Sequence, residues 1–390
     1  MDRYHNPFTP GAGALPPELA GRTQVIEDGR VLAGRTLLGR YEKGLMLIGL
    51  RGVGKTVLLK HLAEAARREK IVPVTVEVRN SKNDMEELSL RLREALSLID
   101  FGCKMKAKVH YAFSVLRNFV KTFSLNIGDF GLSVETAPGV AGSGNMEFDL
   151  SEVLLACAQA AKESDTAIGL YVDEFQNLEL PAMRGMIVAL HRAAQEALPL
   201  YLVGSGLPSI RGLVGKSKTY AERMFNYAEI GALTEEESAA AIAIPLNENG
   251  LGIAADALSA IYVQTKGYPY FLQEFGYQIW IDASGREITA SDIARISSCV
   301  QDRLDGNFFD VRFDRVSNSE RQFLRAMADG PDAVEIAAVA ERMGRTVAAL
   351  SPMRASLIRK GMLYSPAHGQ IAYTVPQFGE YMKRVMPYCL

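Results

Sequence analysis

Cysteine is scarce in this sequence, and its placement excludes two structural classes. The chain of 390 residues has four cysteines, and no two of them show the C-x-x-C spacing that is typical of a zinc site. Their number and scatter also argue against a disulfide scaffold. We therefore expect neither kind of site and interpret these residues as small buried side chains or free thiols: Cys103, Cys157, Cys299 and Cys389.

Long apolar runs and an excess of charge are also absent. No run approaches the roughly 20 apolar residues that cross a bilayer, and residues 1–17 lack a signal-peptide core. We therefore expect a cytoplasmic protein without a membrane partner. A formal net charge of −2 gives no global signature of nucleic-acid binding. A hydrophobic content of 48% over this length predicts substantial cores in two or three domains.

The most informative segment that is present is a phosphate-binding loop. Residues 49–56 fit the pattern G-x-x-x-x-G-K-[ST], with an apolar run before them and an amphipathic run after them. This order predicts a strand, a glycine loop and a helix, in which backbone N–H groups and the helix N-terminus surround phosphate oxygens. Lysine then reaches the β and γ phosphates, and threonine offers its hydroxyl to Mg²⁺. The predicted nucleotide-binding residues are Gly49, Arg51, Gly52, Val53, Gly54, Lys55, Thr56 and Val57.

A second apolar segment, residues 168–172, ends in two carboxylates, Asp173 and Glu174. This is the Walker B pattern, in which the first carboxylate holds Mg²⁺ and the second polarises the attacking water. Alone, such a segment could be an ordinary strand that ends in solvated acids. Together with the phosphate loop it predicts a hydrolytic site, with Thr56 and Asp173 at the metal and Lys55 and Glu174 as catalytic residues.

The spacing of the elements predicts the fold class. Strands near residues 45, 73, 168 and 200 alternate with helices, which predicts an α/β P-loop fold with a parallel sheet and helices on both faces. The chain lacks the Asn-Lys-x-Asp motif that reads guanine and the Leu-Ser-Gly-Gly signature of transporters. The first absence favours ATP over GTP, and the second argues against a transporter-type ATPase.

With these motifs placed, the chain resembles the AAA+ ATPases of the origin-recognition-like and archaeal-ATPase group, which are related to the STAND signalling ATPases. In that group an N-terminal strap closes over adenine, and residues 6–8 and 19–22 resemble it, including Gly21 and Arg22. Residues 267–271 resemble the Gly-x-Pro element of the helical lid, whose Pro269 would touch the base. Bottom-up, Gly267 can end one helix and Pro269 can begin the next without any nucleotide.

The resemblance also implies two further catalytic residues. A polar residue at the end of the third strand touches the γ-phosphate or the water in this group, which indicates Ser205, although a turn-forming role fits Ser205 equally. An arginine finger commonly precedes the next short strand, which indicates Arg223. Arg223 could instead pair with Glu222 or Glu229 on the surface. The arginine of a second sensor motif is not evident in the lid.

Residues 311–390 are predicted to form a winged-helix domain, after an ATPase core at 1–230 and a helical lid at 231–310. A helix to about residue 328, a second at 334–343 and a third at 351–360 precede two apolar strands. Ser351 is the expected N-cap of the third helix, with Pro352 in its first turn. Eleven Lys/Arg against seven Asp/Glu give this region a charge of +4. The candidate DNA contacts are Arg345, Arg354, Arg359 and Lys360, with Arg342 nearby; a protein-binding role for the domain stays open.

A basic insertion at about 101–150 is a second candidate DNA surface. Residues 101–126 hold five cations and no acid, and four aromatic residues are interleaved with the cations: Tyr111, Phe113, Phe119 and Phe123. This composition suits phosphate contact with base stacking. An amphipathic helix with its aromatics packed on the core is an equal alternative. An alternating segment, residues 123–134, is read as a hairpin. The candidate contacts are Lys104, Lys106 and Lys108.

Two functions follow from these expectations. The first is an ATP-hydrolysing, nucleotide-controlled switch or assembly factor that forms a homo-oligomer on double-stranded DNA, in the manner of an initiator, loader or mobile-element regulator. The second is a STAND-like signalling ATPase whose winged helix contacts a client protein instead. ATP and Mg²⁺ are the expected cofactors in both.

Overall fold

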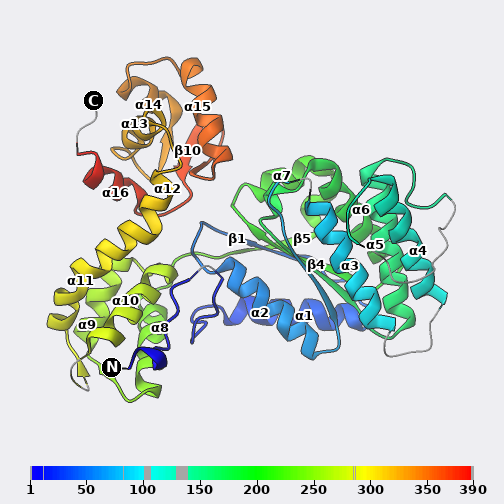
Figure 1. The fold of residues 1–390 in the computed structure, drawn as a ribbon, viewed down its shortest axis with the longest axis horizontal. Helices are drawn as coiled ribbons and strands as arrows, with labels where there is room; N and C mark the ends of the chain where they lie inside the picture. The colour runs from blue at the N-terminus through cyan, green and yellow to red at the C-terminus, as the bar shows by residue number, and fades with distance from the viewer. Residues whose placement is uncertain are drawn as a thin grey trace.

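The computed structural model describes residues 2–11, 13–81, 83–100, 107–128, 139–283, 285 and 287–387. It shows an α/β body with a helical lid and a small C-terminal domain at one of its ends (Figure 1). Lys104, Lys106, Cys103 and Cys389 lie outside the described residues. Within them, no helix is long and apolar enough to cross a membrane.

The body is built on a five-stranded sheet in the order β2-β3-β4-β1-β5, and every adjacent pair is parallel. The predicted parallel sheet is thus confirmed. The strand expected near residue 200 runs to Gly206, so Ser205 lies within it, and the short strand expected after Arg223 is the fifth strand of the sheet. The strands are β1 (Gly44–Ile48), β2 (Val72–Glu77), β3 (Ile168–Asp173), β4 (Leu200–Gly206) and β5 (Phe225–Glu229).

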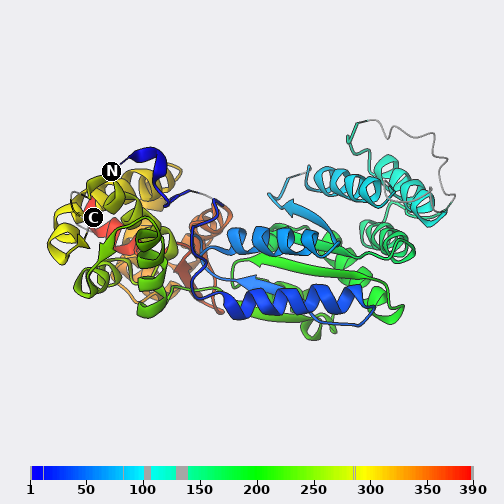
Figure 2. The same cartoon turned by 90° about the horizontal axis from the view of Figure 1, so that it is seen from below.

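Alternate residues of each strand enter different cores, because successive side chains of a strand point to opposite faces. Leu45 and Leu47 of β1 pack in the core that contains α1 and α2, whereas Met46 and Ile48 pack against the helices of the other face. Figure 2 shows α1 and α2 side by side on their face of the sheet. The helices of the body are α1 (Thr23–Leu37), α2 (Lys55–Arg68), α3 (Asp84–Asp100), α4 (Ala107–Thr122), α5 (Met146–Glu163), α6 (Leu180–Gln195) and α7 (Ile210–Ser217).

The predicted basic insertion contains the amphipathic helix α4. Its aromatic residues Phe113 and Phe119 are buried among α3 and α5, so these two rings follow the packing alternative. Lys108 is exposed, and its backbone N–H donates to Glu163 Oε2 at 3.1 Å. The expected hairpin at 123–134 shows no strand in residues 123–128, and its remainder lies outside the described residues.

The lid follows β5 and is helical. A capping box fixes its start, because Thr234 accepts from the N–H of Glu237 and the Glu237 carboxylate accepts from the N–H of Thr234. Gly267, at φ +72°, separates α9 from α10, and Pro269 is the first residue of α10, as expected. The elements are α8 (Glu235–Glu248), β6 (Gly252–Ile253), α9 (Ala255–Thr265), α10 (Pro269–Asp282), β7 (Glu287–Ile288) and α11 (Ala290–Leu304).

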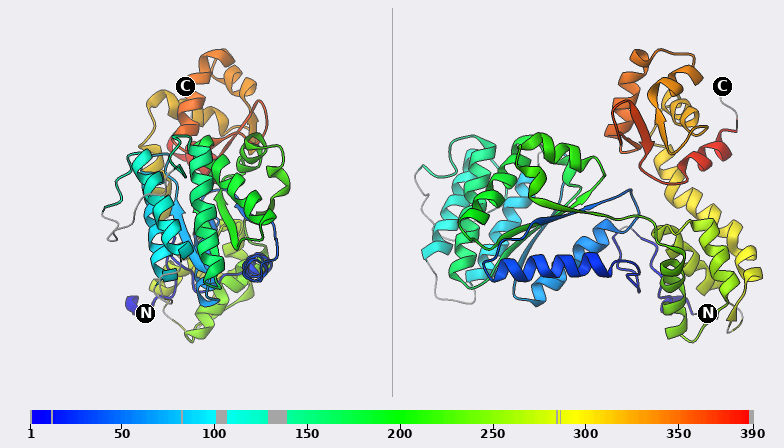
Figure 3. Two further views of the ribbon diagram at one scale, coloured as in Figure 1. Left: turned by 90° about the vertical axis from the view of Figure 1, so that its right-hand side faces the viewer. Right: turned by 180° about the vertical axis from the view of Figure 1, so that it is seen from behind.

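A connector leads from the lid to the C-terminal domain. It begins with a π-helical segment, η4 (Asp305–Asp310), and continues into the single turn α12 (Val311–Phe313). Segments of this kind often lie at functional sites. Figure 3 shows the C-terminal domain above the lid and beside the end of the sheet, so the connector sets the position of that domain.

The C-terminal domain contains helices and a three-stranded antiparallel sheet, β8-β10-β9. The expected cap at Ser351 is wrong, because α15 begins one turn earlier with Thr346 as N-cap. Pro352 therefore lies inside the helix, where it lacks the N–H that would pair with a carbonyl one turn earlier. Residues 334–335, expected to begin the second helix, belong instead to the strand β8. The elements are α13 (Asn318–Met327), β8 (Ala333–Glu335), α14 (Ile336–Arg342), α15 (Val347–Arg359), β9 (Leu363–Tyr364), β10 (Gln370–Tyr373) and α16 (Phe378–Val385).

Candidate nucleotide site

The phosphate loop joins β1 to α2, and its glycines are required by its geometry. A Cβ on Gly49 would lie 2.0 Å from the carbonyl oxygen of Ile230, so only glycine fits there. Gly52 and Gly54 have φ values of +82° and +95°, in the left-handed region that side chains disfavour. Gly54 also precedes the first residue of α2. The loop thus presents its backbone and a helix N-terminus to one cavity, as phosphate binding requires.

Lys55 carries a buried charge at the start of α2. The residue is 7% exposed, and Nζ donates to the carbonyl oxygen of Leu50 at 2.6 Å. Burial lowers the pKa of Lys55 to about 8, and the carboxylates of Glu174 and Asp173 oppose this shift. A buried ammonium with no ion-pair partner among the described residues fits a place where a phosphate supplies the missing negative charge.

Asp173 gathers three groups from three separate segments. Thr56 Oγ1 donates to Asp173 Oδ2 at 2.6 Å, the Ser205 hydroxyl donates to Asp173 Oδ1, and the N–H of Glu174 donates to the same oxygen at 2.9 Å. The parallel register brings them together, because Leu47 of β1 lies opposite Ser205, and Val172 of β3 opposite Gly204. Ser205 is fully buried. It therefore orients the carboxylate rather than forming a surface turn.

The donor set fits Mg²⁺ held together with a nucleotide. Mg²⁺ prefers oxygen ligands and keeps several from water and phosphates. Across the described ranges, no group of three or more His, Cys, Asp or Glu side chains could hold a metal ion. The hydroxyl of Thr56 and the carboxylate of Asp173, which lie in contact, are the oxygen donors that would hold the ion together with phosphate and water oxygens.

Glu174 is held aside by a neighbouring amide. Its backbone is left-handed, with φ 52° and ψ 42°, and its carboxylate accepts a hydrogen bond from Gln176 Nε2. Gln176 Oε1 in turn accepts from the N–H of Leu207, just beyond β4, at 3.1 Å. Strained backbone of this kind is frequent at functional sites. The sequence pattern found Glu174 but gave no sign of the Gln176 contact.

A cavity of about 460 Å³ lies beside the phosphate loop, which is the size of a small-molecule site. Its walls come from the N-terminal strap, the loop with the first turn of α2, the lid and the connector. Val57 and Pro269 line it. Arg22 lines it too, and Nη2 donates to the carbonyl oxygen of Gly231 at 2.6 Å, which ties the strap to the start of the lid. Gly21 does not line it; a Cβ there would meet the carboxylate of Glu237 at 2.5 Å.

Arg312 is a pocket residue that the sequence motifs did not indicate. It lies on α12, lines the cavity, stacks on the Phe308 ring with its Cζ 4.1 Å from the centroid, and donates to the Phe308 carbonyl. Burial and the nearby Arg51 lower its pKa. Within the described residues it has no ion-pair partner. It thus brings a third guanidinium, after Arg22 and Arg51, to a site whose lid lacks the expected arginine. No local sequence motif surrounds Arg312 that could have revealed it.

Arg223 lies at the opposite end of the sheet from the phosphate loop. It ends the short turn η3 (Ala221–Arg223) that precedes β5, whereas the loop follows the carboxyl end of the adjacent parallel strand β1. Arg223 is exposed, and no hydrogen bond or ion pair of its guanidinium is found among the described residues. Glu229 pairs instead with Arg211 at 3.0 Å. The structure therefore separates Arg223 from the nucleotide site of its own chain.

The candidate DNA contacts of the C-terminal domain fall into two groups. Lys360 Nζ donates to Glu320 Oε2 at 2.7 Å, and Arg354 Nη2 donates to the Ser365 hydroxyl at 2.8 Å. Arg345 and Arg359 are exposed. Of these four candidates, Arg345 and Arg359 are therefore the cations that are free to contact a ligand, whereas Lys360 and Arg354 are bound within the domain.

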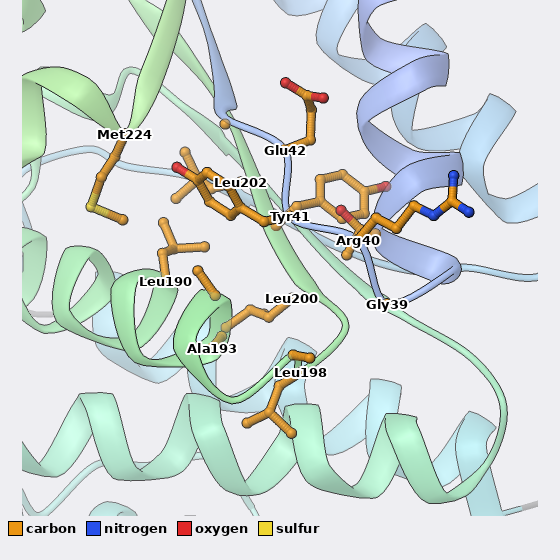
Figure 4. Close-up of a pocket in the computed structure, with 15 residues that line it drawn as sticks. Gly39, Arg40, Tyr41, Glu42, Leu190, Ala193, Leu198, Leu200, Leu202 and Met224 are labelled. Carbon is orange, nitrogen blue, oxygen red and sulfur yellow. The ribbon is translucent and has the colours of Figure 1, made fainter.

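A second cavity, at the amino ends of the inner strands β1 and β4, holds only about 30 Å³ (Figure 4). Apolar side chains such as Leu190, Leu200 and Leu202 line much of it, together with the turn that contains Tyr41. It has room for about one water molecule. It is therefore a packing defect behind β1 and β4 rather than a ligand site.

Comparison with known proteins agrees with this assignment. Residues 39–213 match the model of the AAA domain, and residues 306–382 match a domain of unknown function (DUF8462). No curated protein matches the sequence. Among solved structures, the Walker-type ATPase PABY2304 of Pyrococcus abyssi is 17% identical with a TM-score of 0.55, over 92% of this chain and 95% of that one.

The ORC2 protein of Aeropyrum pernix is also similar. Its ADPNP and ADP complexes are 15% identical to this chain with a TM-score of 0.52, over 97% of both chains. Its ADP form is 14% identical with the same TM-score, over 99% of this chain and 98% of that one. Residues 39–213 therefore resemble the AAA domain in sequence, and the chain has the P-loop NTPase α/β fold of these archaeal Walker-type and ORC proteins.

Proposed function

We propose that this protein is an ATP-hydrolysing switch that binds ATP with Mg²⁺ and, in the ATP state, assembles into a homo-oligomer on double-stranded DNA. The observation that carries the enzymatic part is the convergence of Thr56, Ser205 and the Glu174 N–H on the Asp173 carboxylate, beside a glycine loop and a buried lysine. Such an arrangement has little use in a protein that only holds a nucleotide.

Each group has a distinct role in this proposal. Mg²⁺ neutralises charge on the phosphates when it is bound. Lys55 would leave the Leu50 carbonyl for the phosphates, and Thr56 with Asp173 would hold the ion. Ser205 fixes the orientation of Asp173. Glu174 would accept a proton from the attacking water once its carboxylate leaves Gln176, so the Gln176 contact keeps the resting enzyme slow.

Assembly is supported by the position of Arg223. An exposed arginine at the end of the sheet opposite its own phosphate loop cannot serve the nucleotide of its own chain, but it would be free to contact the nucleotide of another copy. There it would stabilise the charge that develops on the transferred phosphoryl group. The cavity holds Arg312 in cis, so the neighbour's arginine adds to a site that already has a guanidinium.

DNA is proposed as the partner on the charge of the C-terminal domain and of the insertion. Arg345 and Arg359 on or beside α15, with Lys108 of α4 and the neighbouring Lys104 and Lys106, would contact phosphates. Because Lys360 and Arg354 are bound within the domain, we expect few phosphate contacts per copy. Assembly on DNA would multiply them.

A STAND-like switch is the alternative, and one contact favours it. The N–H of Arg51 in the phosphate loop donates to the carbonyl oxygen of Thr374 in the C-terminal domain at 3.0 Å. A domain that touches the phosphate loop could report nucleotide state to a client protein without DNA.

The two functions separate in one experiment. The Glu174→Gln protein, with ATP and Mg²⁺, is examined for molar mass by light scattering and for binding to labelled duplex DNA over a salt series. The first function predicts a rise in mass and a DNA affinity that falls steeply with salt. A change in mass or shape without DNA binding supports the client-protein switch. No response to ATP in either measurement contradicts both.

A further inference from the structure

Arg51 occupies an unusual position for a residue inside a phosphate loop. It lines the nucleotide cavity, and its N–H donates to Thr374 of the C-terminal domain. Its guanidinium also reaches that domain, because a Cβ built on Gly361 would lie 2.6 Å from Arg51 Nη2. One residue therefore touches both the cavity and the C-terminal domain.

The surface that receives Arg51 is a rigid unit. Thr374 is fully buried, its hydroxyl donates to the carbonyl oxygen of Gly361 at 2.6 Å, and its N–H donates to that of Met362 at 3.0 Å. Gly361 has φ +68° and follows α15, while Thr374 follows β10. A displacement of Arg51 would thus act on the end of α15 and on the strand hairpin together.

The charge around Arg51 is unbalanced. Arg51 lies near two other cations of the cavity, Lys55 and Arg312, and the pKa values of both are lowered partly by its charge. Its Nε is buried and has no hydrogen-bond acceptor, and no ion pair of Arg51 occurs among the described residues. A guanidinium with an unused donor beside an excess of positive charge is suited to a multiply charged anion.

We propose that Arg51 is the residue by which the pocket distinguishes a nucleoside triphosphate from a diphosphate, and that its guanidinium leaves Gly361 for the terminal phosphate. This inference rests on the proposed nucleotide function and adds the terminal-phosphate ligand and its link to the C-terminal domain. The guanidinium cannot contact Gly361 and the terminal phosphate at the same time. By linkage, a change that weakens the contact of Arg51 with Gly361 then strengthens binding of the triphosphate.

The test compares equilibrium binding of ATPγS and ADP, each with Mg²⁺, to the full chain. For Arg51→Ala we expect the Kd for ATPγS to rise about 10- to 100-fold, since a charge-assisted hydrogen bond is lost, with the Kd for ADP within about threefold of wild type. Arg51→Lys keeps the charge without the fork and should recover part of the loss. Arg40→Ala, an exposed arginine at the far end of the sheet, should change neither Kd.

A second variant tests the link from the other side. Gly361→Asn places a side chain where the Arg51 guanidinium now lies against Gly361. Asparagine tolerates the positive φ of this position. We expect ATPγS to bind about two- to fivefold more tightly, with the Kd for ADP unchanged, because the competing contact of Arg51 with the C-terminal domain is weakened.

Equal losses of ATPγS and ADP binding in Arg51→Ala, or no loss of either, would overturn the proposal, and the Arg51 variants decide this even if Gly361→Asn does not fold. ATPγS binding to Gly361→Asn that is unchanged or weaker would overturn the link. Failure of the underlying function looks different, because wild type would then bind neither nucleotide, or Lys55→Ala would bind both as wild type does.

Discussion

The nucleotide pocket and the C-terminal domain treat their cations in opposite ways. In the pocket, Lys55, Arg51 and Arg312 face a cavity without an ion-pair partner among the described residues. In the C-terminal domain, Lys360 is paired with a buried carboxylate and Arg354 with a hydroxyl of the hairpin. Unbalanced buried charge costs stability, so its concentration at one place indicates where an anion is meant to bind. A cation that is paired within the protein stabilises the fold instead.

The largest expected effect breaks the pocket side of this comparison. Lys55→Ala should weaken binding of ATP and ADP about 100-fold or more, because its ammonium is the group placed to meet the β phosphate and several charge-assisted contacts are lost. Titration with a fluorescent ADP analogue measures it. Lys60→Ala, which removes an exposed lysine of the same helix, is the matched control and should bind within about twofold of wild type. Unchanged binding by the Lys55 variant would contradict the site.

A smaller effect is expected where the pocket is ordered from behind. Ser205→Ala removes the hydroxyl that orients Asp173, and the loss of such a supporting bond typically costs about 10- to 100-fold in metal affinity. The Mg²⁺ concentration that half-saturates ATP binding should rise by this factor. Ser209→Ala, just beyond β4, should leave it unchanged. If the two variants behave alike, Ser205 has no role at the metal.

The paired cations of the C-terminal domain should govern stability rather than binding. Lys360→Ala leaves the buried Glu320 carboxylate without its ammonium and should lower the free energy of unfolding by about 1–3 kcal/mol. Its exposed neighbour Arg359, replaced by alanine, should cost less than about 0.5 kcal/mol. Urea denaturation of both variants measures the difference. Equal effects would show that the Lys360 pair is incidental.

This pair also predicts a pH dependence. Although burial opposes it, hydrogen bonds from Lys360, the Ser317 N–H and Ser356 lower the pKa of Glu320 to about 2. A depressed folded-state pKa stabilises the fold above the ordinary glutamate range near 4.5. That stability is lost as the pH falls from there toward 2. Glu320→Gln should flatten the fall in this window; an unchanged acid limb would contradict the assignment.

The smallest effect concerns the two exposed cations. Arg345→Ala and Arg359→Ala should each weaken duplex DNA binding about three- to tenfold and reduce the salt slope by about one unit. Lys360→Ala should leave the slope unchanged, since its ammonium serves Glu320. A slope that falls equally in all three variants would mean that the internal bonds do not decide which cations reach DNA.

The sequence predicted those parts of the molecule that backbone geometry dictates. The glycines of the phosphate loop, the strand ending in Asp173 and the lid turn at Gly267 were all found, because each needs a particular residue type at a particular place. Adjacent parallel strands then bring Ser205 to Asp173 without further information. A motif of this kind can be recognised in the sequence because the local backbone geometry itself requires its residues.

Contacts between distant segments could not be predicted in the same way. Arg312 reaches the pocket only because a π-helical connector places it there, and Arg51 meets Gly361 only through the docking of a separate domain. The start of α15 was misplaced because Ser351-Pro352 matches a helix start, whereas Thr346 caps the helix one turn earlier. The sequence alone presents Lys360 as a surface cation, because its partner Glu320 lies 40 residues earlier in the chain.

The central claim is that the carboxyl end of the sheet is an ATP-hydrolysing site, and the rate of phosphate release from ATP by wild type and Glu174→Gln tests it most directly. The expected result is measurable release by wild type, in the presence of Mg²⁺, and a rate at least about 100-fold lower for the variant, as for loss of a general base, with ATP still bound as tightly. Equal rates in the two proteins, or a variant that no longer binds ATP, would contradict the role given to Glu174.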